Sequence, residues 1–185
     1  YEDWRELFDK EGQHFDAVTV AIPDHNHALV GLRAMQMKKH LYLQKPLTHD
    51  IHEARIITQA ASKYKVVTQM GNQGSSSKGT RITEAIIKND TIGEVHSVEV
   101  WTNRPVWPQG VQSPKDKGEK QPIPNEVDWN LWLGTAPMRD YHEAYMPFRW
   151  RGYWDFGTGA LGDMGCHFMD VPFRALKLGY PTSVE

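Results

Sequence analysis

The sequence predicts an α/β protein: a partial Rossmann-like segment of parallel βαβ units, followed by the start of an α+β domain with a mostly antiparallel sheet. Three short apolar runs alternate with segments of helical periodicity, and their connections are short. This order is typical of right-handed crossovers between parallel strands. A later segment alternates apolar and polar residues, which indicates a half-buried strand and a change of architecture. We therefore expect two domains, 1–74 and 75–185.

The first half of the chain alternates helices and strands. We expect strands over 15–22, 40–44 and 65–70, and helices over 1–10, over 27–38 and from 48–50 onward. Asp24 or Asn26 is expected to cap the second helix. Polar stretches follow the three strands, at 23–27, 44–46 and 71–73. Because ligands bind beyond the carboxyl ends of parallel strands, these stretches should share one edge of the sheet.

The second half is predicted to begin with a helix that follows the serines at 75–77. The alternating strand covers 94–101, a long loop covers 103–125, and a short helix covers 127–134. The tryptophans of this half could stack on the rings of a sugar, but each of them fits a position in the core or at an interface at least as well. The candidates for a carbohydrate site are Trp101, Trp107, Trp129, Trp132, Trp150 and Trp154.

Composition excludes several functional classes. A net charge of −2 and a pI near 6.5 offer no electrostatic reason to expect nucleic acid or an anionic membrane as a partner. No apolar run approaches the roughly 20 residues of a membrane helix. Cys166 is the only cysteine, so an internal disulfide is excluded. We expect a cytoplasmic protein, although residues 1–10 resemble the middle of a fold and leave export of a longer chain open.

The stretch from Gly157 to Asp170 carries the residues best suited to chemistry. If the chain is helical after Gly159, Asp163 and His167 lie four residues apart on one face, where a carboxylate and an imidazole can address one small molecule. Taken alone, such a pair is more often structural. Lys45 ends a predicted strand just before a proline, where its ammonium could orient a hydroxyl and stabilise an oxyanion.

Other candidate sites weigh less. Cys166 adjoins His167, but neighbouring helical residues point about 100° apart, which disfavours a thiol–imidazole pair. Metal binding by His25 with His27, or by His49 with His52, is also disfavoured, because polar residues are common at helix starts. We expect no metal site.

Three segments together resemble the Gfo/Idh/MocA family of NAD(P)-dependent oxidoreductases, over nearly the whole chain. Residues 21–27 are similar to the strand-end segment T-P-x-x-x-H, and residues 44–46 to the motif E-K-P, whose Lys-Pro bond is often cis. Residues 159–167 resemble the catalytic motif G-x-x-x-D-x-x-x-H, which is the most specific of the three.

The resemblance implies an NAD or NADP cofactor and a sugar or polyol substrate. It makes His167 the base that takes a hydroxyl proton as hydride leaves for nicotinamide, with Asp163 binding the hydroxyl and Lys45 completing the triad. The cofactor-binding residues it implies are Ile22, Pro23, His27, Gln44, Lys45, Pro46, Asn72 and Gln73.

The chain departs from the family pattern in two ways. Gln44 stands where the family has glutamate, which removes a charge beside Lys45. The family's opening strand and its phosphate-binding turn do not precede residues 1–10, and residues 182–185 look like the beginning of another strand. We interpret the chain as an internal piece of a longer protein, inactive by itself, whose intact form is a dimer or tetramer.

Two alternative functions stay open. Some family members cleave glycosides by transient oxidation, elimination and re-reduction on a retained NAD, using the same triad. A binding module without catalytic activity would also keep the fold.

Overall fold

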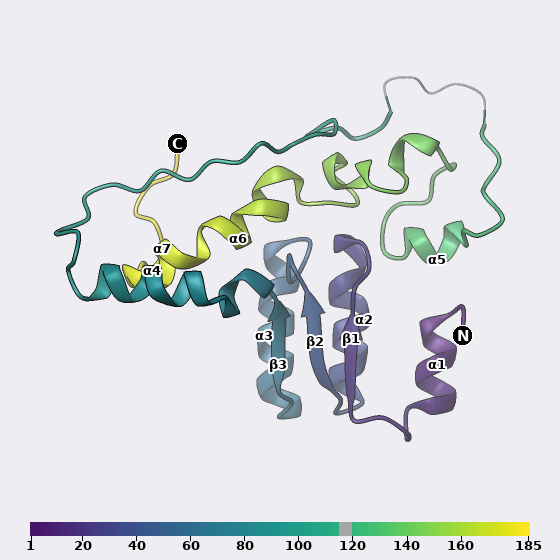
Figure 1. Ribbon diagram of the computed structural model, residues 1–185. Coiled ribbons are helices and arrows are strands. Elements are labelled where there is room, and N and C mark those ends of the chain that lie inside the picture. Colours follow the sequence, from purple (N-terminus) through teal and green to yellow (C-terminus); the bar gives the residue numbers. More distant parts are fainter. Residues whose placement is uncertain (115–119) are drawn as a thin grey trace.

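The computed structural model describes residues 1–114 and 120–185. Its first part contains a parallel sheet of three strands in the order β1-β2-β3, formed by Ala17–Val20, His40–Gln44 and Thr68–Gly71 (Figure 1). Helices α2, Asp24–Gln36, and α3, Ile51–Tyr64, make the crossovers, and α1 covers Trp4–Glu11. The predicted βαβ arrangement is confirmed. The strands end side by side, with Val20 opposite Leu43 and Gln44 opposite Gly71.

Local sequence explains where these helices begin. Asp50 caps α3 by accepting from the Glu53 backbone N–H, and Glu53 returns a bond to the Asp50 N–H, which completes a capping box. The predicted cap of α2 is wrong. This helix begins at Asp24, directly after Pro23, and makes no side-chain cap. Asp24 is instead drawn into a tertiary contact, since its carboxylate accepts bonds from the Thr158 N–H and hydroxyl.

One apolar core holds the helices against the sheet. Its most buried members come from α2, β2 and α3, and α1 adds an aromatic residue. The core comprises Phe8, Val20, Ala28, Val30, Ala34, Met35, Leu41, Leu43, Ile57 and Ala60.

The second part consists of short helices beyond the strand ends, linked by long irregular segments (Figure 1). They are η1 (Gln73–Ser76), α4 (Lys78–Lys88), α5 (Trp129–Leu133), η2 (Glu143–Tyr145), η3 (Arg149–Gly152), the π-helical turn η4 (Leu161–Gly165), α6 (Cys166–Phe168) and α7 (Asp170–Ala175). A second, aromatic core contains Trp129, Leu133, Tyr141, Tyr145, Trp150, Tyr153 and Phe156.

Two expectations about this part are corrected. The strand predicted over 94–101 is not formed: Trp101 is 79% exposed, and no strand of the described residues lies alongside to supply a ladder of hydrogen bonds. The pairing between described strands is parallel throughout, so the predicted antiparallel sheet does not appear in them. The segment after Gly159 is helical as far as Phe168, but residues 161–165 form a π turn and a bend interrupts the helix at Met169.

None of the helices in the described ranges is long and apolar enough to cross a membrane.

Candidate active site

Lys45 and Asp163 meet where the two parts of the molecule join. The Lys45 ammonium lies 2.6 Å from Asp163 Oδ1 and also donates to the Asp163 carbonyl oxygen at 3.2 Å. Their side chains are only 19% and 7% exposed. Lys45 is placed by the end of β2, and Asp163 by the π turn, a type of turn that often occurs at functional sites. The Lys45–Pro46 bond is cis, as the resemblance implies.

His167 follows one turn later, close enough to both groups to sense their charges. Burial lowers the pKa of His167, and the Lys45 cation lowers it further, while Asp163 opposes them by raising it. The ring is therefore neutral at neutral pH, which leaves a lone pair free to accept a proton. Among the described residues Asp163 makes no hydrogen bond to His167; its carboxylate faces cations instead.

Two arginines complete the surroundings of Asp163, and sequence reasoning missed both. Arg151 Nε lies 3.3 Å from Asp163 Oδ1, and Arg104 Nη1 lies 4.0 Å from Oδ2. Arg151 belongs to η3, and Arg104 follows the segment at 94–101. The only signal in the sequence was the density of arginines and aromatics at 141–154, which gives no partner for any one of them.

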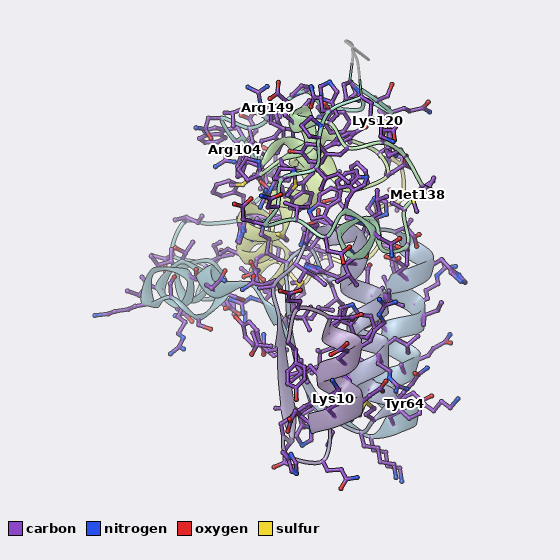
Figure 2. The ribbon with its side chains drawn as sticks, turned by 90° about the vertical axis from the view of Figure 1, so that its right-hand side faces the viewer. Lys10, Tyr64, Arg104, Lys120, Met138 and Arg149 are labelled. Carbon is purple, nitrogen blue, oxygen red and sulfur yellow. The ribbon has the colours of Figure 1, made fainter. Side chains whose placement is uncertain are left out.

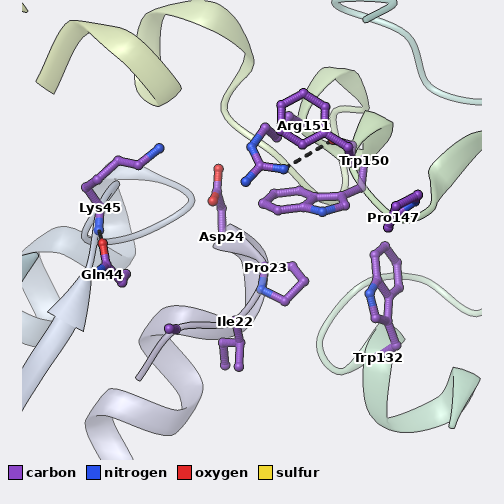
Figure 3. Close-up of a pocket in the computed structure, with 11 residues that line it drawn as sticks. Ile22, Pro23, Asp24, Gln44, Lys45, Trp132, Pro147, Trp150 and Arg151 are labelled. Carbon is purple, nitrogen blue, oxygen red and sulfur yellow. Dashed lines mark hydrogen bonds between the residues drawn. The ribbon is translucent and has the colours of Figure 1, made fainter. Parts of the chain in front are cut away.

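A cavity of about 460 Å³ opens beside this cluster, at the carboxyl ends of β1 and β2. Figure 3 shows Lys45, Asp24 and Arg151 pointing into the same space, with Trp150 and Trp132 on the far side. The cavity is lined by Ala21, Ile22, Pro23, Asp24, Gln44, Lys45, Trp132, Pro147, Phe148, Trp150 and Arg151.

Asp24 was predicted as a possible helix cap within the polar stretch at 23–27, and it lies on the cavity wall. Burial raises the pKa of its carboxyl, and the hydrogen bond from Thr158 and nearby cations oppose that rise. The two carboxyl groups of the site thus differ in surroundings: Asp163 faces three cations, whereas Asp24 faces Thr158.

Most of the predicted cofactor-binding residues lie at this edge. Ile22, Pro23, Gln44 and Lys45 line the cavity. Gln73 donates to the Gln44 amide oxygen at 3.4 Å. Asn72 donates to the Cys166 carbonyl at 2.7 Å, which ties the end of β3 to α6.

His27 and Pro46 have different surroundings. His27 is 1% exposed, and its ring nitrogens lie 2.7 Å from the carbonyl oxygens of Pro46 and Ile22. The His27 side chain thereby ties together the chain segments that follow β1 and β2 and does not line the cavity.

The residues present fit the nicotinamide end of a dinucleotide. Ile22 and Pro23 provide an apolar wall for a flat ring, and the Gln44 amide lies beside it. In the described structure the buried Asn72 Oδ1 has no hydrogen-bond partner, so an acceptor is available at the same edge.

The six tryptophans proposed for a carbohydrate site differ in their burial. Trp132 and Trp150 line the cavity, Trp107 and Trp129 are buried, and Trp101 and Trp154 are exposed elsewhere.

Burial raises the pKa of the Cys166 thiol, which disfavours the thiolate a nucleophile needs. The His25 ring packs between Trp132 and Phe156, with its nitrogens near their carbonyl oxygens, so no metal pair with His27 is arranged.

A parallel βαβ sheet with a cavity beyond the carboxyl ends of its strands is the arrangement found in dinucleotide-binding folds. Residues 1–72 match the family model described as "Oxidoreductase family, NAD-binding Rossmann fold". Residues 82–178 match the model "Oxidoreductase family, C-terminal alpha/beta domain". The chain belongs to the Gfo/Idh/MocA family of oxidoreductases, whose first domain binds NAD(P).

Two curated proteins and one solved structure illustrate what the chain is similar to. A levoglucosan dehydrogenase of Pseudarthrobacter phenanthrenivorans is 23% identical over 91% of this chain and 34% of its own length. The uncharacterized oxidoreductase YrbE of Bacillus subtilis is 26% identical over 56% of this chain and 30% of its own. A solved structure, that of an inositol dehydrogenase homologue from Azotobacter vinelandii complexed with NADH and myo-inositol, is 26% identical in sequence. The match covers 51% of this chain and 26% of that chain, with a TM-score of 0.49. The chain spans about a third of the length of these curated relatives.

Proposed function

We propose that the intact protein transfers hydride between NAD(P) and a hydroxyl-bearing carbon of a sugar or polyol. The observation that carries this proposal is the 2.6 Å contact between Lys45 and Asp163 beside the cavity at the strand ends, with His167 one turn away. Sugar and polyol substrates are named for two of the relatives. We further propose that residues 1–74 and 75–185 are the cofactor and substrate portions, and that the intact protein is a dimer or tetramer.

His167 supplies the base in this proposal. Its neutral ring accepts the substrate's hydroxyl proton, the hydride leaves the same carbon for the nicotinamide that NAD(P) supplies, and a carbonyl remains. The Lys45 ammonium stabilises negative charge on the oxygen as the proton departs. Asp163 holds the Lys45 ammonium in place and, by its charge, favours the protonated form of His167.

The experiment is an assay of the full-length protein with NAD⁺ and NADP⁺ against a panel of sugars, polyols and glycosides. We expect substrate-dependent formation of reduced nicotinamide, and His167→Asn should lower kcat by roughly 100- to 10,000-fold with NADH binding retained. Glycoside cleavage without net NADH would favour the transient-oxidation mechanism. Ligand binding without turnover, unaffected by His167→Asn, would favour a binding module and contradict the proposal.

A further inference from the structure

Positive charge exceeds negative charge around Asp163, beside the candidate substrate cavity. Lys45, Arg151 and Arg104 approach Asp163 at 2.6, 3.3 and 4.0 Å. The other carboxyl group here is that of Asp24, and burial raises its pKa and so weakens its negative charge. His167 adds no negative charge. The cations therefore outnumber the carboxylates even when both aspartates are ionised.

Both guanidinium groups lie against aromatic rings. The Arg151 guanidinium lies 4.4 Å from the Phe148 ring centroid and 4.3 Å from that of Trp150. The Arg104 guanidinium lies 5.3 Å from the Trp107 ring centroid and 5.5 Å from that of Phe148. Both arginines thus contact Phe148. A guanidinium stacked on a ring keeps its N–H edge directed outward, ready for two parallel bonds to an anion.

Much of this donor capacity is unused. Arg151 donates through Nε to Asp163 and through Nη1 to the Phe148 carbonyl, which leaves Nη2 without an acceptor in the described structure. Within the same described ranges the Arg104 guanidinium makes no hydrogen bond, although its side chain is only 29% exposed. Figure 2 places Arg104 at the end of the molecule beyond the sheet, opposite Lys10 and Tyr64. Asp163 is the one carboxylate within 4.0 Å of these cations in the described ranges, so a second anion could use the donors that Asp163 leaves free.

We propose that the substrate carries an anionic group, as in a sugar acid or a sugar phosphate, and that Arg151 and Arg104 bind this group while Lys45, Asp163 and His167 act on a neighbouring hydroxyl. This inference rests on the proposed function. Phe148 provides the shared platform that holds both guanidinium groups in position.

The test is steady-state kinetics of the full-length protein with matched substrates: a neutral sugar, the corresponding sugar acid and the corresponding sugar phosphate. We expect kcat/KM for at least one anionic form to exceed that of the neutral sugar by roughly 10-fold or more, and the preference to weaken as salt is added. The sugar acid and the sugar phosphate distinguish a carboxylate-binding from a phosphate-binding subsite.

Variants assign the preference to residues. Arg104→Gln should raise KM for the anionic substrate by roughly 10- to 100-fold, and Arg104→Lys should restore part of the loss. Arg149→Gln is the matched control: Arg149 is exposed on the same 3₁₀ helix as Arg151, makes no ion pair with Asp163 in the described ranges, and should leave the preference intact.

Three results would overturn the inference. Equal or better turnover of the neutral sugar would reject an anionic substrate and leave the proposed function standing, whereas no reduction of nicotinamide with any substrate would reject the proposed function itself. If Arg104→Gln lowers the affinity for NADH as much as it lowers the affinity for the substrate, the cations bind the phosphates of the cofactor and not the substrate.

Discussion

Replacing Asp163 by asparagine should destabilise the protein more than removing the cation nearest to it. Asp163 is 7% exposed and faces Lys45, Arg151 and Arg104. Removal of one partner from a buried ion pair costs roughly 3–5 kcal/mol, because the other charge is left uncompensated. Asp163→Asn leaves three facing cations, so we expect a cost in this range. Lys45→Met leaves Asp163 paired with Arg151 and should cost less, about 1–2 kcal/mol.

Urea unfolding of the full-length variants measures these costs as changes in the free energy of unfolding. In a double-mutant cycle, Lys45→Met should recover part of the stability lost in Asp163→Asn, because it removes one of the uncompensated cations. The exposed pair of Lys10 with Glu6 provides a control, and Glu6→Gln should give a change too small to resolve. Equal costs for the two single variants, or a larger cost for Lys45→Met, would refute the reasoning.

Two further predictions concern the proposed reaction. Because the pKa of His167 is lowered, kcat/KM for oxidation should persist below pH 6.5 and fall only as the ring protonates at more acidic pH. Lys45→Met removes a cation that lowers this pKa, so the acidic limb of the pH profile should shift to higher pH. Coinciding pH profiles of the two proteins would contradict the role of Lys45. A Cβ at Gly71 would lie 2.6 Å from Gln44 Oε1, so Gly71→Ala should displace the Gln44 side chain and weaken NADH binding, measured by fluorescence titration, with thermal unfolding as the control for stability.

The sequence determined the type and order of the elements in the βαβ part, although the start and the cap of α2 differ from the prediction. Hydrophobic periodicity and turn residues are local properties, and they located β2 at its observed bounds and the start of α3 within residues 48–50, where Asp50 caps it. Because parallel strands end at a common edge, the positions of Pro23, Lys45 and Asn72 relative to one another also followed from order along the chain. The motif spacing selected Asp163 and His167.

Tertiary structure alone decided which groups surround Asp163. Arg104 and Arg151 come from separate segments of the chain, and charged residues carry no periodicity that reveals their partners. The segment at 94–101 has the alternation of a strand, yet a strand forms only where a neighbour pairs with its backbone, and local pattern does not contain that neighbour. His27 likewise had the sequence of a cofactor contact, but the carbonyl oxygens of Ile22 and Pro46 surround its ring. Local periodicity thus specifies elements and edges, while the charge balance of the cavity arises only when distant segments pack together.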